Sequence, residues 1–79
     1  MRYNKDVITL LEVPVGKYAR LVDASSALRK RLAQYGLHLD DRLHMLRVAP
    51  MGGPLLVEVN GREIALGRAV AEKILVEVE

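Results

Sequence analysis

The residues of this chain that could do chemistry are two histidines, a pair of aspartates and a pair of serines. His38 lies close to Asp40 and Asp41, and His44 stands alone; imidazole and carboxylate groups can ligate divalent ions. Neither spacing is a recognised ligand pattern, and without cysteine no thiolate can complete a site. We therefore expect no dedicated metal site and no cofactor. His38, His44 and Asp40 are retained only as weak metal candidates.

Nucleophiles and phosphate-binding loops are equally scarce. The histidines have no cysteine to activate, and Ser25 and Ser26 are better used as N-caps of a helix. The pair Gly52-Gly53 is followed by Pro54, which lacks the backbone N–H that a phosphate loop needs. We predict that the protein is not an enzyme.

Charge is distributed unevenly along the chain. Residues 17–47 hold seven Lys/Arg against three Asp/Glu, and residues 58–79 hold three against five, within a formal net charge of +2. This indicates either a basic surface for an acidic partner or an ordinary solvated face. Nucleic acid binding is kept as an alternative, although the chain lacks an aromatic platform for stacking bases. The arginines that could form such a basic face are Arg20, Arg29, Arg31, Arg42 and Arg47.

Length and composition favour one small domain over residues 1–79. A chain of this size buries one thin core, and without cysteine its stability must come from packing in a reducing, cytoplasmic setting. The apolar run 7–11 is too short for a signal peptide or a membrane span. We expect no membrane insertion.

The elements are organised around the turn Ala49-Pro50-Met51-Gly52-Gly53-Pro54, which joins the apolar runs 43–48 and 55–59. Two prolines and two glycines predict a tight reversal between strands. Asn60-Gly61 predicts a second hairpin with a type I′ turn, which pairs Val57 with Ile64 and Leu55 with Leu66 on a buried face.

One helix, at about residues 25–35, is predicted by Leu28, Leu32 and Tyr35 on one stripe and by Gly36-Leu37 at its end. Further strands are expected at 17–23, at 42–49 and at 73–79, with a short strand or bridge at 7–13. In the strand 42–49, His44 is expected on one face with Leu46 and Val48. The predicted fold is mainly β: a small SH3-like five-stranded barrel with one short α-helix inserted after an early strand.

These residues resemble the FeoA family along nearly the whole chain. The resemblance is carried by the basic leucine-bearing helix ending in Gly36-Leu37 and by the Ala-Pro-x-Gly-Gly-Pro turn, with further matches at Gly16, Ile64-Ala65-Leu66 and Ile74-Leu75-Val76. One departure is Leu39-Asp40, where family members usually have Pro-Gly; Asp40 or Asp41 can supply an Asx-type hydrogen bond there.

The resemblance implies an SH3-like barrel that supports or regulates the membrane ferrous iron transporter FeoB from its cytosolic side. The alternative is a regulatory module like the SH3-like domain of iron-dependent repressors of the diphtheria toxin repressor type. We predict a protein–protein adaptor; its strand edges could also pair copies into a homo-oligomer. The predicted partner contacts are Arg29, Arg31 and Tyr35 on the helix and Met51, Gly52, Gly53 and Pro54 in the turn, although Tyr35 could instead complete the core stripe of the helix.

Overall fold

A computed structural model describes residues 7–79 as one curled antiparallel sheet with two helices. The order of strands in the sheet is β1-β6-β2-β3-β4-β5, so β1 and β5 are the edge strands. The strands are β1 (Val7–Thr9), β2 (Tyr18–Asp23), β3 (Arg42–Val48), β4 (Leu55–Val59), β5 (Arg62–Leu66) and β6 (Leu75–Val78).

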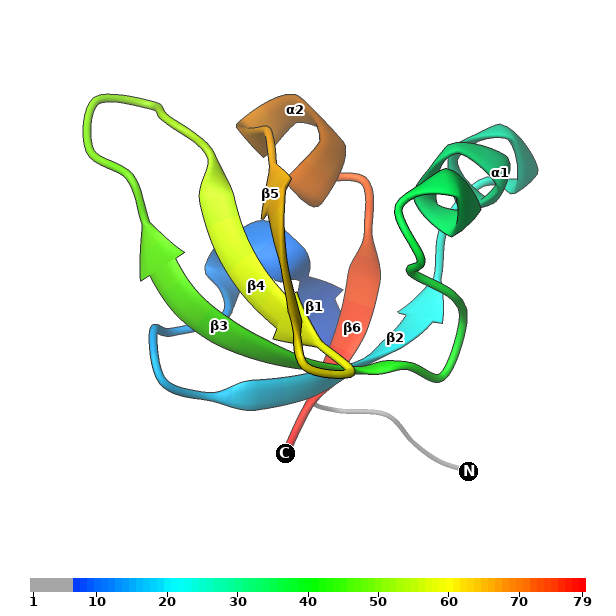
Figure 1. Ribbon diagram of the computed structural model, residues 1–79, viewed down its shortest axis with the longest axis horizontal. Coiled ribbons are helices and arrows are strands. Elements are labelled where there is room, and N and C mark those ends of the chain that lie inside the picture. The colour runs from blue at the N-terminus through cyan, green and yellow to red at the C-terminus, as the bar shows by residue number, and fades with distance from the viewer. Residues whose placement is uncertain (1–6) are drawn as a thin grey trace.

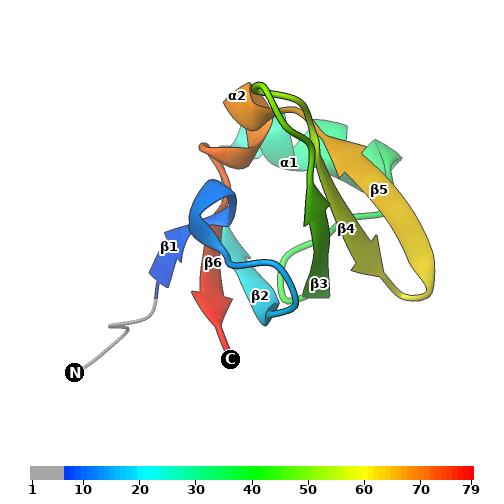
Figure 2. The ribbon, with the colours of Figure 1, turned by 90° about the vertical axis from the view of Figure 1, so that its left-hand side faces the viewer.

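The sheet folds over on itself around a single apolar core. Figure 2 shows β1, β6 and β2 on one side and β3, β4 and β5 on the other. Leu21, Leu43, Val57 and Val76 are almost fully buried between them. This confirms the mainly β, SH3-like fold, with six strands where five were expected. The sixth strand is β1, which lies within the short strand or bridge predicted at residues 7–13; it pairs with β6 and ends where the chain enters the short 3-10 helix Leu10–Glu12.

The helix α1 (Ser26–Gln34) lies where the sequence predicts it, beyond the end of β2 (Figure 1). Ser25 caps it by accepting a hydrogen bond from the Leu28 N–H. At the other end Gly36 has φ 85°, and the Leu37 N–H donates to the Leu32 carbonyl, which is the pattern of a Schellman cap. A second, one-turn helix, α2 (Arg68–Ala71), links β5 to β6.

The hairpin of β4 and β5 has the predicted register. Val57 pairs with Ile64 and Leu55 with Leu66, and all four side chains are buried. Strand β3 departs from the prediction, because a bulge shifts its register between Met45 and Arg47. Val48 consequently pairs with buried Leu55 and packs against the core. The expectation that His44 and Val48 share a face was therefore wrong.

The turn at Leu39-Asp40 forms without proline or glycine. The Asp41 N–H donates to the His38 carbonyl, and the Asp41 carboxylate accepts from the His38 N–H three residues earlier, in place of the expected Asx-type bond to a later N–H. Asp40 takes the left-handed conformation, with φ 70°, at the position where a glycine would be free of strain.

Candidate functional site

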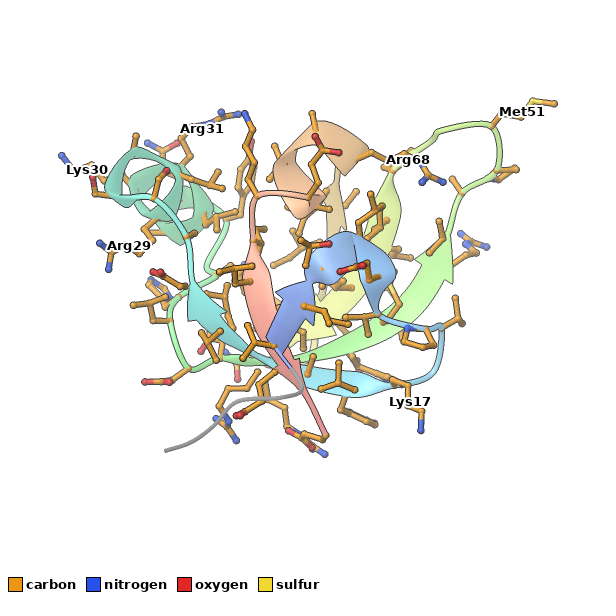
Figure 3. All side chains as sticks on the ribbon, turned by 180° about the vertical axis from the view of Figure 1, so that it is seen from behind. Lys17, Arg29, Lys30, Arg31, Met51 and Arg68 are labelled. Atoms are coloured by element: carbon orange, nitrogen blue, oxygen red, sulfur yellow. The ribbon has the colours of Figure 1, made fainter. Side chains whose placement is uncertain are left out.

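The loop between β3 and β4 projects from the barrel and presents Met51 at its tip (Figure 3). The Gly53 N–H donates to the Pro50 carbonyl over 3.1 Å, and the Ala49 N–H donates to the Pro54 carbonyl over 2.9 Å. Met51 and Gly52 both have positive φ, 58° and 77°, which is the pattern of a type I′ turn. Met51 is 102% exposed. The loop thus holds an apolar thioether side chain fully in solvent on a backbone that methionine disfavours.

Two contacts set the base of this loop. Arg68, at the start of α2, donates to the Ala49 carbonyl over 3.5 Å, and Figure 3 shows it between α2 and the loop. A Cβ at Gly53 would come within 2.7 Å of the Ala49 side chain, so this position needs glycine for close packing. Arg68 keeps one buried guanidinium nitrogen, Nε, without a hydrogen-bond partner in the described chain. The loop is therefore anchored at its base and exposed at its tip.

The basic residues of α1 are divided between two sides of the helix. Arg29 borders a groove of about 410 Å³ that lies between α1 and the segment 37–39. Arg31 and Tyr35, one helical turn apart, border hollows on the opposite side, toward α2 and β5. Figure 3 shows Arg29 and Arg31 pointing in different directions. The predicted contact residues of the helix do not form one continuous face.

Tyr35 ends α1 as an exposed residue. Its side chain is 53% exposed, and its carbonyl accepts a hydrogen bond from the Arg62 guanidinium over 3.0 Å. The buried residues of α1 are Leu28 and Leu32. The alternative that Tyr35 completes the core stripe was wrong, because Leu28, Leu32 and Leu37 fill the core at this helix while Tyr35 stays exposed.

The weak metal candidates lie in two separate places. The Nδ1 of His38 is 3.7 Å from the Asp41 carboxylate, and the backbone carbonyl of Asp40 accepts from Arg20. The Nδ1 of His44 is 3.8 Å from the Glu58 carboxylate across β3 and β4. Within residues 7–79 no group of three or more His, Cys, Asp or Glu side chains is gathered as a metal site would require.

His44 belongs instead to a stack on the outer face of the sheet that the sequence analysis missed. Its ring lies parallel to the Tyr18 ring at 4.1 Å, and the Arg42 guanidinium lies 4.1 Å from the centre of the Tyr18 ring. Arg42 also forms a two-pronged ion pair with Glu79, with its shortest N–O distance at 2.8 Å. The hydrogen bonds between them lower the pKa of Glu79 and raise the pKa of Arg42. In the sequence, the only signal that Tyr18 and His44 share a face is the alternation of inward-facing and outward-facing side chains along β2 and β3.

Comparison with known proteins places this chain in a family. The model of the FeoA domain matches residues 8–78, which is nearly the whole described chain. The chain belongs to the FeoA family. FeoA proteins are small accessory proteins associated with iron transport and are not an established family of enzymes.

Individual relatives agree with the family assignment. Over 56 residues the chain is 34% identical to a protein of Methanocaldococcus jannaschii (strain ATCC 43067 / DSM 2661 / JAL-1 / JCM 10045 / NBRC 100440) named "Putative Fe(2+) transport protein A"; the match covers 71% of this chain and 66% of that one. A crystal structure of an iron uptake regulatory protein, FeoA, is 27% identical with a TM-score of 0.81, covering 92% of this chain and 99% of that one.

The fold is shared more widely than the family. A manganese-dependent transcriptional repressor superposes with a TM-score of 0.82 at 24% identity, over 92% of this chain and 42% of that chain. At that identity the likeness concerns the fold alone. Among the described residues, no helix of this FeoA-family chain has the length and apolar character needed to span a membrane.

Proposed function

We propose that this FeoA-family protein is an accessory protein of ferrous iron uptake that contacts the cytosolic part of a FeoB-type transporter. The family match over residues 8–78 supports the link to iron transport. The observation that favours a contact is Met51, which is fully exposed at the tip of an anchored loop. An exposed thioether that adapts its shape to an apolar pocket suits a protein partner.

The proposed contact surface has two parts. One is the loop at Met51, Gly52, Gly53 and Pro54, in which the glycine turn brings the tip clear of the barrel. The other is α1, which presents Arg31 and Tyr35 on one side and Arg29 on the opposite side; none of the three is buried. In Figure 3 the Met51 loop and α1 lie along the upper edge of the molecule, at opposite ends of its long dimension, and Lys17 lies on the lower edge.

A binding measurement with the purified cytosolic part of the transporter tests this proposal. Met51→Ser removes the apolar tip and should weaken binding by about tenfold if the side chain enters a pocket. Lys17→Glu, on the lower edge of the molecule in Figure 3, serves as the control and should bind as the parent protein does. Equal binding of parent, Met51→Ser and a Tyr35→Ala variant would contradict the proposed contacts.

A regulatory module is the second candidate, supported by the likeness to the manganese regulator SloR, which is 27% identical with a TM-score of 0.77 over 91% of this chain and 34% of that chain. It predicts binding to a protein or oligonucleotide of a regulatory complex in place of the transporter. Titration of a fluorescent oligonucleotide at low and high salt separates the two: binding that falls steeply with salt favours the second candidate. No binding at low salt eliminates a nucleic-acid role.

A further inference from the structure

Helices α1 and α2 face one another across a groove at the open end of the barrel. One part of the groove, of about 320 Å³, lies between Leu28 and Arg31 of α1 and Val70 and Lys73 at α2. A second part, of about 170 Å³, shares Leu28, Arg31 and Val70 and extends to Tyr35. The shared residues make the two parts one continuous groove that runs along α1.

The floor of this groove is apolar and its walls are basic. Leu28 is almost buried, with 7% of its surface exposed, and Val70 is half-buried against the core. Arg31 and Lys73 stand on opposite walls, and no acidic residue of the described chain lines either part. Within residues 7–79, neither of these two side chains takes part in a hydrogen bond or an ion pair. Two uncompensated cations thus lie over an apolar floor.

The N-terminus of α1 adds to this positive potential. Ser25, the N-cap of the helix, lines the same groove, and the first turn of α1 contains no acidic residue. The unpaired amide groups of a helix N-terminus carry a partial positive charge that favours anions. Together with Arg31 and Lys73, the helix end gives the lining of the groove a positive potential; the nearby carboxylates of Asp23 and Glu72 are not part of that lining.

We propose that this groove binds an acidic, amphipathic segment of a protein partner. An apolar side chain of the segment rests on Leu28 and Val70, and its carboxylates lie between Arg31 and Lys73. The inference deepens the proposed function and rests on it for the identity of the partner, the transporter's cytosolic part. It assigns a binding role to Lys73, and it separates Arg31 and Tyr35 from Arg29, which lies on the other side of α1.

The shape of the groove favours a peptide segment over a small anion. A phosphate or a lipid headgroup would neutralise the two cations but would leave the apolar floor in water. A helical segment with one apolar stripe flanked by acidic side chains covers both, because residues three or four positions apart in a helix lie on the same side. Tyr35 at the far end provides an exposed ring and hydroxyl for a further contact.

Charge reversal on both walls provides the first test. Arg31→Glu with Lys73→Glu should weaken binding of the transporter's cytosolic part by about tenfold or more, because carboxylates would then face carboxylates. Lys17→Glu with Lys30→Glu makes the same change in net charge outside the groove and should bind as the parent does. Both variants change exposed residues, and their circular dichroism and midpoint of urea unfolding establish that each is folded. If both double variants weakened binding equally, the proposal that the partner binds in the groove would be overturned.

A second test needs no transporter. The probe is a capped helical peptide with leucine on one stripe and glutamate on either side of it, titrated into the isotope-labelled protein while amide chemical shifts are followed. Shifts confined to α1, to residues 67–73 and to Tyr35, lost when the glutamates are replaced by glutamine, support the groove. An absence of shifts, or shifts centred elsewhere, overturns it. Binding to anionic vesicles without binding of the peptide also overturns it, in favour of a lipid surface.

The two tests fail in different ways. If the peptide binds in the groove and the transporter does not bind at all, the groove is supported as a binding site for acidic segments and the proposed function fails. If the transporter binds equally well to the parent and to the Arg31→Glu, Lys73→Glu variant, the proposed function stands and the groove fails.

Discussion

The two hairpin turns of the sheet adopt similar backbone conformations with very different residues. Asn60 and Gly61 join β4 to β5 with φ of 51° and 81°, and Met51 and Gly52 occupy the middle of the β3–β4 loop with φ of 58° and 77°. Asparagine tolerates the left-handed conformation, and Asn-Gly is the preferred pair for a type I′ turn. Methionine has neither advantage. One turn is built from residues that suit its backbone, and the other is not.

This difference bears on function. A left-handed conformation costs an ordinary residue about 1 kcal/mol or more, and Met51 makes no compensating contact because it is wholly exposed. Local departures from good turn chemistry concentrate at functional sites. The Asn60-Gly61 turn therefore serves the fold, and the Met51-Gly52 turn is the better candidate for contact with a partner. Four predictions test or sharpen this comparison, in order of decreasing effect.

The largest effect is expected at the base of the Met51 loop. Gly53→Ala should lower the free energy of unfolding by about 2 kcal/mol, because the added Cβ would lie 2.7 Å from the Ala49 side chain. Gly67→Ser is the control, since a Cβ at Gly67 meets no atom within 4 Å and serine suits the N-cap of α2. Urea unfolding measures both. Equal stability of the two variants would mean that the loop base relaxes freely and is not anchored.

Exchanging the turn residues tests the comparison directly. Met51→Asn should raise the free energy of unfolding by about 0.5–1 kcal/mol, and Asn60→Met should lower it by a similar amount. The reason is that asparagine adopts a positive φ more readily than methionine does. The same Met51→Asn variant should bind the partner more weakly. A gain in stability together with unchanged binding would show that Met51 is not a contact residue.

The turn at Leu39-Asp40 extends the comparison to a third non-glycine residue with positive φ. Leu39→Pro with Asp40→Gly should raise the free energy of unfolding by about 0.5 kcal/mol, since proline restricts the unfolded chain and glycine relieves the strain at φ 70°. Thermal and urea unfolding measure the gain. Because this turn lies outside the groove between α1 and α2, binding of the partner should not change. Weaker binding of the double variant would show that the turn contacts the partner.

The smallest effect is expected at the Arg42–Glu79 ion pair on the outer face of the sheet. Hydrogen bonds from Arg42 lower the pKa of Glu79, so the pair stabilises the fold above the ordinary glutamate pKa. This contribution is lost as the pH falls through the lowered pKa, when the carboxylate takes up a proton. Glu79→Gln should therefore be slightly less stable than the parent near pH 7 and equal to it at pH 2. A difference that persists at pH 2 would show a packing role for Glu79.

Several features could be predicted from the sequence because neighbouring residues determine them. Ser25, the leucines of the stripe and Gly36-Leu37 define both ends and the buried side of α1 within one short segment. The pair Asn60-Gly61 defines the register of β4 and β5, since a two-residue loop leaves one pairing of the apolar faces. In each case the signal lies within a few residues of the structure that it predicts.

Other features required contacts between distant parts of the chain. The bulge in β3 follows from how that strand pairs with β4, and no residue type marks it. Arg42 and Glu79 are 37 residues apart, and Arg31 meets the groove opposite Lys73 only because α2 returns the chain beside α1. The basic run of α1 predicted a charged surface but not its division into two sides, which depends on what packs against each side of the helix.

The sequence by itself determined the strands, the helix, the two hairpin turns and the resemblance to the FeoA family, because propensity, alternation and capping act over short distances. The tertiary structure alone decided that Met51 is presented at an anchored tip, that Tyr35 stays out of the core and that a basic, apolar-floored groove separates α1 from α2. Exposure and grooves are properties of surfaces, and surfaces exist only once distant segments have packed together.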